Sequence, residues 1–147
     1  MQNLFANVAT IASEGTMYLG MGEGSLGMID VRDIADSFVA LLLNEGHENK
    51  IYTPTGPESI SFIEAAKTLS EDLSKSVTYV PVSIEAVGEA IIAAGWGDWG
   101  ADVMMDYSKA YAEGWGDFTT NDVETVTGKK ARTFSQFSTE ILAPAIN

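Results

Sequence analysis

The hydrophobic positions of residues 1–82 alternate between the 3.6-residue spacing of helices and the shorter runs of extended strands. Helical spacing predicts three helices, over residues 2–14, 31–45 and 61–73. Extended runs predict four strands, over residues 17–19, 26–29, 50–55 and 77–82. Ser61 and Glu64 form a capping box at the start of the third helix. Pro81 interrupts the last strand, which we therefore expect at a sheet edge.

From Ser83 onward the pattern is helical. Three further helices are predicted, over residues 83–94, 98–113 and 133–143. Ser83 and Asp98 are expected to cap the first two, and Thr133 with Gln136 makes a capping box at the head of the third. A short turn is expected over residues 122–127.

Two of the predicted helices carry a clear apolar face of the kind that usually packs on a protein core. In the helix after Asp30 this face consists of Val31, Ile34, Ala35, Phe38, Leu41 and Leu42. In the helix after Asp98 it consists of Trp99, Val103, Tyr107, Ala110 and Tyr111.

These elements predict an α+β fold with a few short strands and a mainly helical C-terminal lobe. The 147 residues form one domain that is large enough to bury a core. We divide this domain into a sheet-and-helix portion, residues 1–82, and a helical lobe, residues 83–147.

Charge and composition narrow the set of partners. Twenty-one acidic residues against eight basic ones give a net charge of −13, which repels nucleic-acid phosphates and anionic membranes. The longest apolar run, residues 38–43, is too short to span a bilayer, and no signal-peptide pattern opens the chain. Cysteine is absent, which excludes disulfides and thiol chemistry. We expect a cytoplasmic protein with neither a nucleic-acid nor a membrane partner.

Three motifs resemble the C-terminal half of the NmrA-like family. They are MIDVRDIA at 28–35, KIYTPTGPE at 50–58, and the closing pattern in which Thr127-Gly128 is followed by RTF at 132–134 and by Phe137. Ala131 stands where that family usually has proline. Members are atypical short-chain dehydrogenase/reductases that bind NAD(P) on a Rossmann sheet, and they include quinone and dye reductases and redox-sensing regulators.

The resemblance implies the C-terminal portion of an α/β Rossmann-type protein, without the first strand and its Gly-rich phosphate turn. It therefore implies NAD(P) for a full-length protein and no cofactor held by this chain alone. The glycines of GMGEG at 20–24 are a poor substitute, because no strand–turn–helix unit surrounds them and Glu23 would repel phosphate. We interpret this segment as an ordinary turn.

Few residues are suited to catalysis. Asp30, Arg32 and Asp33 could form an acid/base pair held by an arginine, but a helix N-terminus keeps carboxylates ionised, so we favour a structural role. His47, the only histidine, lies in a polar link and is expected to be a solvated loop residue. A Tyr-x-x-x-Lys pattern, a Gly-x-Ser-x-Gly elbow and metal-ligand spacing are all absent. We predict no catalytic residue and no metal site.

The aromatic residues of the helical lobe are the best binding candidates. They are Trp96, Trp99, Tyr107, Tyr111 and Trp115. The resemblance implies that this lobe lines the substrate pocket, whereas aromatic residues at helical spacing more often pack a core. As substrate-binding residues we select Trp96, Trp99, Met104 and Tyr107.

Two functions are compatible with these observations. One is the C-terminal portion of an NAD(P)-dependent oxidoreductase for quinones or other flat organic substrates, inactive alone because the dinucleotide site is absent. The other is a non-catalytic, oligomeric binding or regulatory domain of the redox-sensor type. In either case the strand over 50–55 would lack its sheet neighbours, so we expect a homodimer, able to bind a small aromatic ligand.

Overall fold

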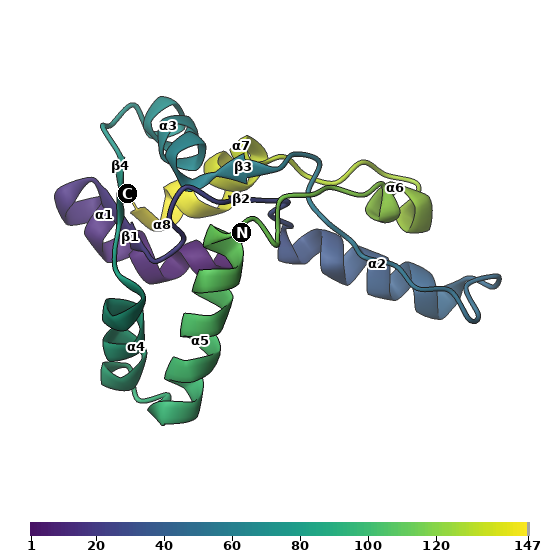
Figure 1. Ribbon diagram of the computed structural model, residues 1–147. Helices are drawn as coiled ribbons and strands as arrows, with labels where there is room; N and C mark the ends of the chain where they lie inside the picture. Colours follow the sequence, from purple (N-terminus) through teal and green to yellow (C-terminus); the bar gives the residue numbers. More distant parts are fainter. Residues whose placement is uncertain (147) are drawn as a thin grey trace.

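The computed structural model describes residues 1–146, which form a body with two arms (Figure 1). One arm is the hairpin of α4 (Ile84–Ala93) and α5 (Gly97–Ala112), which points downward in Figure 1. The other contains α2 (Val31–Leu43) and α6 (Asp122–Thr127), and it extends to the right. The arms leave the body in different directions, so the space between them is bordered by α5 and α2.

The body holds the hydrophobic core between the first and last helices. Its helical elements are η1 (Gln2–Asn7, a 3-10 helix), α1 (Val8–Glu14), α3 (Phe62–Leu73), α7 (Phe134–Phe137), η2 (Ser138–Leu142, a π-helix) and α8 (Ala143–Ile146). Ile11, Met17, Leu69 and Phe137 are fully buried there. The C-terminal helices therefore complete a core that the N-terminal helix begins.

The strands form two separate two-stranded sheets. Strand β1 (Thr16–Leu19) pairs in parallel with β4 (Thr78–Pro81). The short β2 (Ser25–Leu26) pairs antiparallel with β3 (Ile60–Ser61). The edge position predicted for the last strand is confirmed, because a sheet of two strands consists of edges only. The predominance of helix over a few short strands confirms the predicted α+β class.

Side-chain caps fix several helix starts where the sequence places them. The carboxylate of Asp30 accepts a hydrogen bond from the backbone N–H of Arg32 at the start of α2. The hydroxyl of Ser83 accepts one from the N–H of Ala86 at the start of α4. Both predicted capping boxes are complete, at the starts of α3 and α7.

Four local predictions are wrong. The strand expected over 26–29 is limited to the two residues of β2, and residues 27–30 belong to no strand or helix. Residues 50–55 are extended but form no strand, because within residues 1–146 no neighbouring strand lies beside them; the backbone of Thr53 instead bonds to the side chains of Asp122 and Thr120. Helix α5 begins at Gly97 rather than behind a cap at Asp98, which lies in its first turn. The turn expected over 122–127 is the short helix α6.

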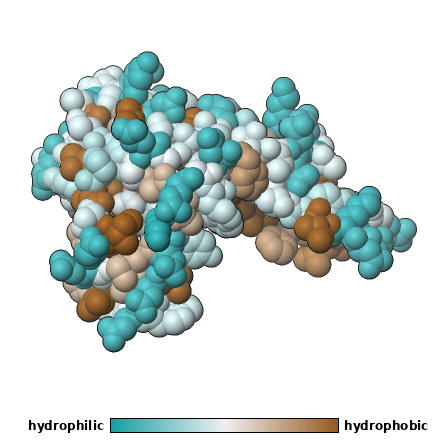
Figure 2. Space-filling model, in the orientation of Figure 1, coloured by the Kyte–Doolittle hydropathy of each residue, from teal (hydrophilic) through white to brown (hydrophobic). Residues whose placement is uncertain are grey.

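The orientation of α2 also differs from the expected one, in which the apolar face of a helix packs on the protein core. Its apolar face is turned outward: Phe38 is 63% and Leu42 is 82% exposed, whereas the polar residues Asp33 and Ser37 are buried. In Figure 2 hydrophobic colour gathers on the lower side of this arm. The pattern correctly indicated which positions are apolar. Of the six, Ile34 and Leu41 are half-buried, whereas the remaining four are exposed in residues 1–146.

None of the helices in residues 1–146 has the length and apolar character needed to cross a bilayer.

Candidate functional site

The four residues selected from the sequence lie along one helical hairpin without forming a single site. Trp96 and Trp99 occupy the tip of the α4–α5 hairpin and are strongly exposed, with Trp99 at 79%. Eight residues separate Trp99 from Tyr107, which corresponds to about 12 Å along a helix axis. Met104 is half-buried between them. The binding role of these residues stays a prediction.

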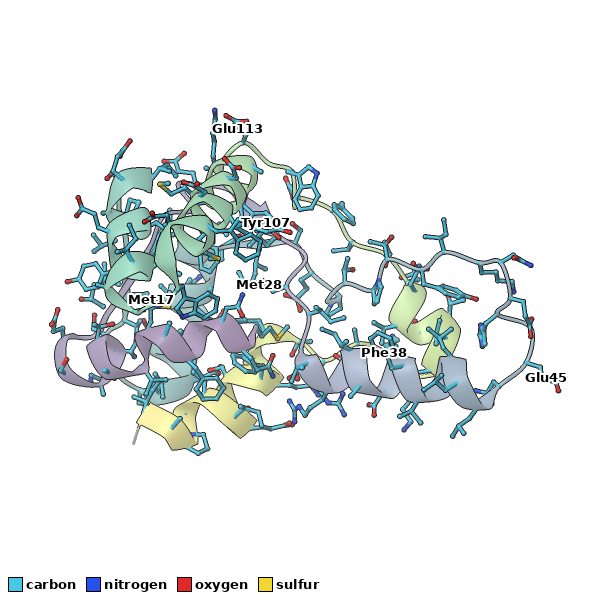
Figure 3. All side chains as sticks on the ribbon, turned by 90° about the horizontal axis from the view of Figure 1, so that it is seen from below. Met17, Met28, Phe38, Glu45, Tyr107 and Glu113 are labelled. Atoms are coloured by element: carbon cyan, nitrogen blue, oxygen red, sulfur yellow. The ribbon has the colours of Figure 1, made fainter. Side chains whose placement is uncertain are left out.

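Three aromatic rings do come together at the other end of α5. The rings of Tyr107 and Tyr111 stack with centroids 5.8 Å apart, and the ring of Trp115 lies 5.5 Å from Tyr111 and 6.4 Å from Tyr107. We call Tyr107, Tyr111 and Trp115 the aromatic platform. Trp115 is 63% exposed and Tyr107 46%, so the platform presents ring surface to solvent. In Figure 3 the side chain of Tyr107 lies on the side of α5 toward Met28 and α2.

The end of α5 holds the platform in place. After the helix, the N–H of Trp115 donates to the carbonyl of Ala110 (3.0 Å), and Gly114 adopts a left-handed conformation with φ of 89°. This turn brings Trp115 back onto the face of the helix that carries Tyr107 and Tyr111. Because the left-handed conformation favours glycine, the sequence Gly114-Trp115 is well suited to this arrangement.

The glycine-rich segment 20–24 packs against the platform from behind. A Cβ atom at Gly24 would overlap the carbonyl oxygen of Tyr111, so only glycine fits there. The hydroxyl of Tyr79 donates to the carbonyls of Leu19 (3.1 Å) and Gly22 (3.0 Å) and fixes the segment on the body. The glycines therefore have a packing role, and the segment leads into β2 rather than into a helix N-terminus that could bind phosphate.

Tyr111, the half-buried member of the platform, stays uncharged at neutral pH. Burial raises the pKa of the Tyr111 phenol, and the neighbouring Tyr107 adds to this rise. Flat and partly stacked rings suit a planar apolar ligand.

The charged motif at the start of α2 joins two distant parts of the chain. Arg32 bonds to Asp30 through Nη2 (2.7 Å) and to Glu140 through Nη1 (2.6 Å). Burial acts to raise the pKa of Asp30, but hydrogen bonds from Arg32 and Gln2 outweigh it and hold the pKa at about 2. A carboxyl group with this pKa has no proton to give at neutral pH, which supports a structural role.

A second ion pair lies one turn further along α2. Arg132 pairs with the buried carboxylate of Asp33 and also lies 3.3 Å from Asp36. Its backbone N–H donates to Asp33 as well, at 2.8 Å. The two arginines together attach α2 to the C-terminal segment that carries α7 and η2.

His47 lies in the link that follows α2 and is half-buried rather than fully solvated. Its Nδ1 is 2.9 Å from the hydroxyl of Tyr52, and the two rings meet edge to face. No cluster of three or more histidine or acidic side chains suited to a metal ion occurs among residues 1–146.

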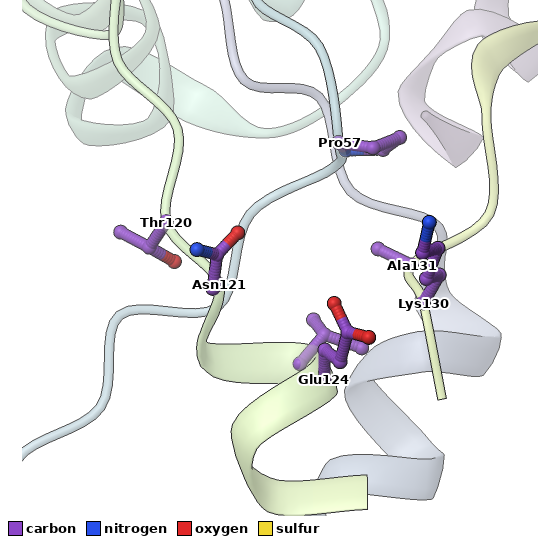
Figure 4. Close-up of a pocket in the computed structure, with 7 residues that line it drawn as sticks. Pro57, Thr120, Asn121, Glu124, Lys130 and Ala131 are labelled. Carbon is purple, nitrogen blue, oxygen red and sulfur yellow. The ribbon is translucent and has the colours of Figure 1, made fainter. Parts of the chain in front are cut away.

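Two shallow pockets lie away from the platform. One, of about 240 Å³, is lined by Pro57, Thr120, Asn121, Val123, Glu124, Lys130 and Ala131 (Figure 4). The other, of about 330 Å³, lies between α4 and α5 and has four carboxylate residues on its rim, Glu85, Glu89, Asp98 and Asp102. Neither contains a residue of the platform, and neither brings together polar groups in a pattern that indicates a reaction.

No family model matches this chain. The NAD(P)H azoreductase of Xenophilus azovorans is 37% identical to it over 141 residues, which are 94% of this chain and 48% of the azoreductase. The triphenylmethane reductase of Citrobacter sp. superposes with a TM-score of 0.76 at 23% identity, covering 97% of this chain and 48% of the reductase.

The Escherichia coli NADPH-dependent quinone oxidoreductase complexed with NADPH gives a TM-score of 0.83 at 21% identity, over 95% of this chain and 50% of that one. The chain spans about half the length of the curated relatives that it matches. Its fold, mostly helical with a few short strands, matches the C-terminal lobe of NAD(P)-binding reductases.

Proposed function

We propose that these residues are the C-terminal portion of an NAD(P)H-dependent oxidoreductase that reduces quinones or other flat organic compounds. The observation that carries the proposal is the 37% identity to the azoreductase along 94% of this chain. The aromatic platform adds support from the structure, because exposed stacked rings bind planar compounds through dispersion and stacking.

In this proposal the chain binds and orients the substrate. Tyr107 and Trp115 supply ring faces, and Tyr111 supports both from the half-buried position between them. Trp96, Trp99 and Met104, which the resemblance implies for the substrate pocket, lie further along the same arm. The hydride comes from a nicotinamide cofactor.

The cofactor does not fit the residues described here. The glycine-rich turn at 20–24 is filled by its own packing against α5, and it carries Glu23. We therefore propose that the pyrophosphate is held outside residues 1–146, and that this chain alone does not turn over.

The platform can be tested by tryptophan fluorescence. With Trp96→Phe and Trp99→Phe as background, Trp115 is the remaining tryptophan. Titration with 1,4-naphthoquinone should quench it saturably, and Tyr107→Ser should weaken the apparent affinity about tenfold. Tyr18→Ser removes a tyrosine of similar exposure on β1 and is the matched control. Quenching that is linear in quinone, or equal in both tyrosine variants, would contradict the platform as a binding site.

The non-catalytic alternative is favoured by one observation, the exposed apolar residues of α2, which suit a stable oligomer.

The two functions differ in their response to the NADPH cofactor. A saturable change in NADPH fluorescence on adding this chain would contradict the claim that the cofactor is held elsewhere. A predicted homodimer would be visible in sedimentation as a mass twice that of the 15.7 kDa chain.

A further inference from the structure

The hairpin of α4 and α5 carries a shallow groove on the side that faces away from the aromatic platform. Successive residues of a helix are turned by about 100°, so Asp102 and Met105 in the groove lie on the side of α5 opposite Tyr107. The groove has a volume of about 330 Å³. We call it the α4–α5 groove. It is separate from the ring surface that we assign to the substrate.

The floor of the α4–α5 groove is apolar. Gly88 and Ala101 are buried where the two helices approach each other. Met105 lies over Gly88, where an added Cβ atom would come within 2.7 Å of the Met105 sulfur. Ile92 extends the floor toward the tip of the hairpin and is 50% exposed. In helical bundles, an apolar strip between two neighbouring helices is the surface on which a third helix packs.

Two rows of carboxylates border this floor. Glu85 and Glu89 form one row on α4. Asp98 and Asp102 form the other row on α5, and in both rows the residues are four positions apart, which places them on one side of their helix. All four side chains are exposed, and within residues 1–146 none of them is in an ion pair. In Figure 2 the downward arm shows hydrophobic colour between hydrophilic residues.

This arrangement suits an extended cation rather than a single ion. Among residues 1–146, no three acidic or histidine side chains converge on a point where a metal ion could bind. Parallel acidic rows on either side of an apolar strip instead complement a helix with one apolar stripe and lysine or arginine on both of its flanks. Amphipathic helices bind in apolar grooves in this way, and flanking charge pairs select the partner.

We propose that the α4–α5 groove is the docking site for an amphipathic helix with basic flanks, supplied by a different protein. The apolar stripe of this helix packs on the floor formed by Gly88, Ile92 and Met105, and its basic side chains pair with the two carboxylate rows. The inference goes beyond the proposed reductase function. It does not depend on the aromatic platform, which lies on the opposite side of α5.

A second copy of this chain does not have the required helix. The sequence contains eight lysine and arginine residues, and no helix within residues 1–146 contains more than one of them. Each copy also carries a net charge of −13, which opposes self-association. The same charge repels nucleic acids and anionic membranes. The partner is therefore a basic polypeptide with a sequence unlike that of this chain.

The test uses the model peptide KLAKLAKKLAKLAK, blocked at both ends. As a helix this peptide has leucine on one side and lysine on its flanks. A scrambled peptide of the same composition has no apolar stripe and controls for attraction by charge alone. Isothermal titration calorimetry measures the affinity of each peptide for the chain, and circular dichroism measures the helix that the peptide gains on binding.

Two double variants test the carboxylate rows. Glu89→Gln with Asp102→Asn removes one charge from each row. Glu45→Gln with Glu71→Gln removes the same net charge from exposed positions outside the groove and is the matched control. The floor is tested by Ile92→Ser, with Ile63→Ser on α3 as a control of similar exposure. Thermal unfolding checks that each variant is folded.

We expect one peptide to bind per chain and to become helical. Glu89→Gln with Asp102→Asn should weaken the affinity about tenfold, and its control pair by less than about twofold. Ile92→Ser should weaken the affinity about fivefold, whereas Ile63→Ser should leave it unchanged.

Four results would overturn the proposal. They are the absence of saturable binding, equal affinity for the scrambled peptide, binding without a gain of helix, and equal effects of the two charge pairs. A chain that sediments as a dimer and becomes monomeric through Ile92→Ser would also overturn it, in favour of a second copy.

Discussion

The carboxylate of Asp30 gives the sharpest stability prediction. Its side chain is fully buried and accepts hydrogen bonds from Arg32 Nη2 (2.7 Å), the Arg32 backbone N–H (2.9 Å) and Gln2 Nε2 (2.9 Å). Asp30→Asn keeps the size of the side chain and an oxygen that can cap α2, but it removes the charge. The substitution therefore isolates the contribution of the carboxylate to the free energy of unfolding.

The pKa supplies the magnitude. A pKa lowered from 3.8 to about 2 corresponds to about 2.5 kcal/mol of stability at neutral pH. Because the pKa is lower in the folded state, this contribution is fully present above pH 3.8 and is lost as the pH falls toward 2. Asp30→Asn should thus cost about 2–3 kcal/mol at pH 7 and close to nothing at pH 2.

Urea unfolding followed by circular dichroism measures both values. Asp36→Asn, on the exposed side of α2, is the control and should change the free energy of unfolding by less than about 0.5 kcal/mol. A loss for Asp30→Asn that is below about 1 kcal/mol at pH 7, or that is the same at pH 7 and pH 2, would refute this reasoning.

Three other substitutions test the packing around the site and the core. Gly24→Ala should destabilise the protein by about 1–3 kcal/mol, because the new methyl group collides with the carbonyl oxygen of Tyr111. Urea unfolding measures this loss of stability, and an unchanged unfolding midpoint would contradict the close packing of Gly24 on α5. Tyr79→Phe removes the hydroxyl that bonds to the carbonyls of Leu19 and Gly22 and should cost about 1–2 kcal/mol, with faster amide exchange over residues 20–24 as a second measure. Thr133→Ala breaks the capping box with Gln136 and should cost about 1 kcal/mol, whereas Thr133→Ser should restore most of it in the same unfolding assay.

Features that depend on neighbouring residues in the sequence were predicted well. The caps at Asp30 and Ser83 and both capping boxes involve residues two or three positions apart, so the sequence contains both partners of each bond. The strand over 50–55 was predicted wrongly for the opposite reason. A strand exists only with a neighbour, and the identity of that neighbour is not a local property.

In the candidate site, too, contacts between residues close in the sequence could be predicted, whereas contacts that depend on turns or on distant residues could not. The spacing of Tyr107 and Tyr111 by four residues predicts their contact on one helix face. The separation of Trp99 from Tyr107 follows likewise from their positions on the predicted helix over 98–113. The contact of Trp115 with the two tyrosines depends on the turn at Gly114. The outward orientation of α2 depends on Arg132, which is 99 residues away from Asp33 in the chain.

The long-range bonds of the two arginines affect the order in which the protein folds during synthesis. Arg32 bonds to Glu140 over 108 residues, and the core around Ile11 is completed by Phe137. A ribosome makes the chain from its N-terminus, so helices such as α3 and α5 can form early, but α1, β1 and α2 remain without their final contacts until the last residues have emerged. The contacts of Arg32 with Glu140 and of Ile11 with Phe137 can therefore form only after residues 137–140 have been added to the chain.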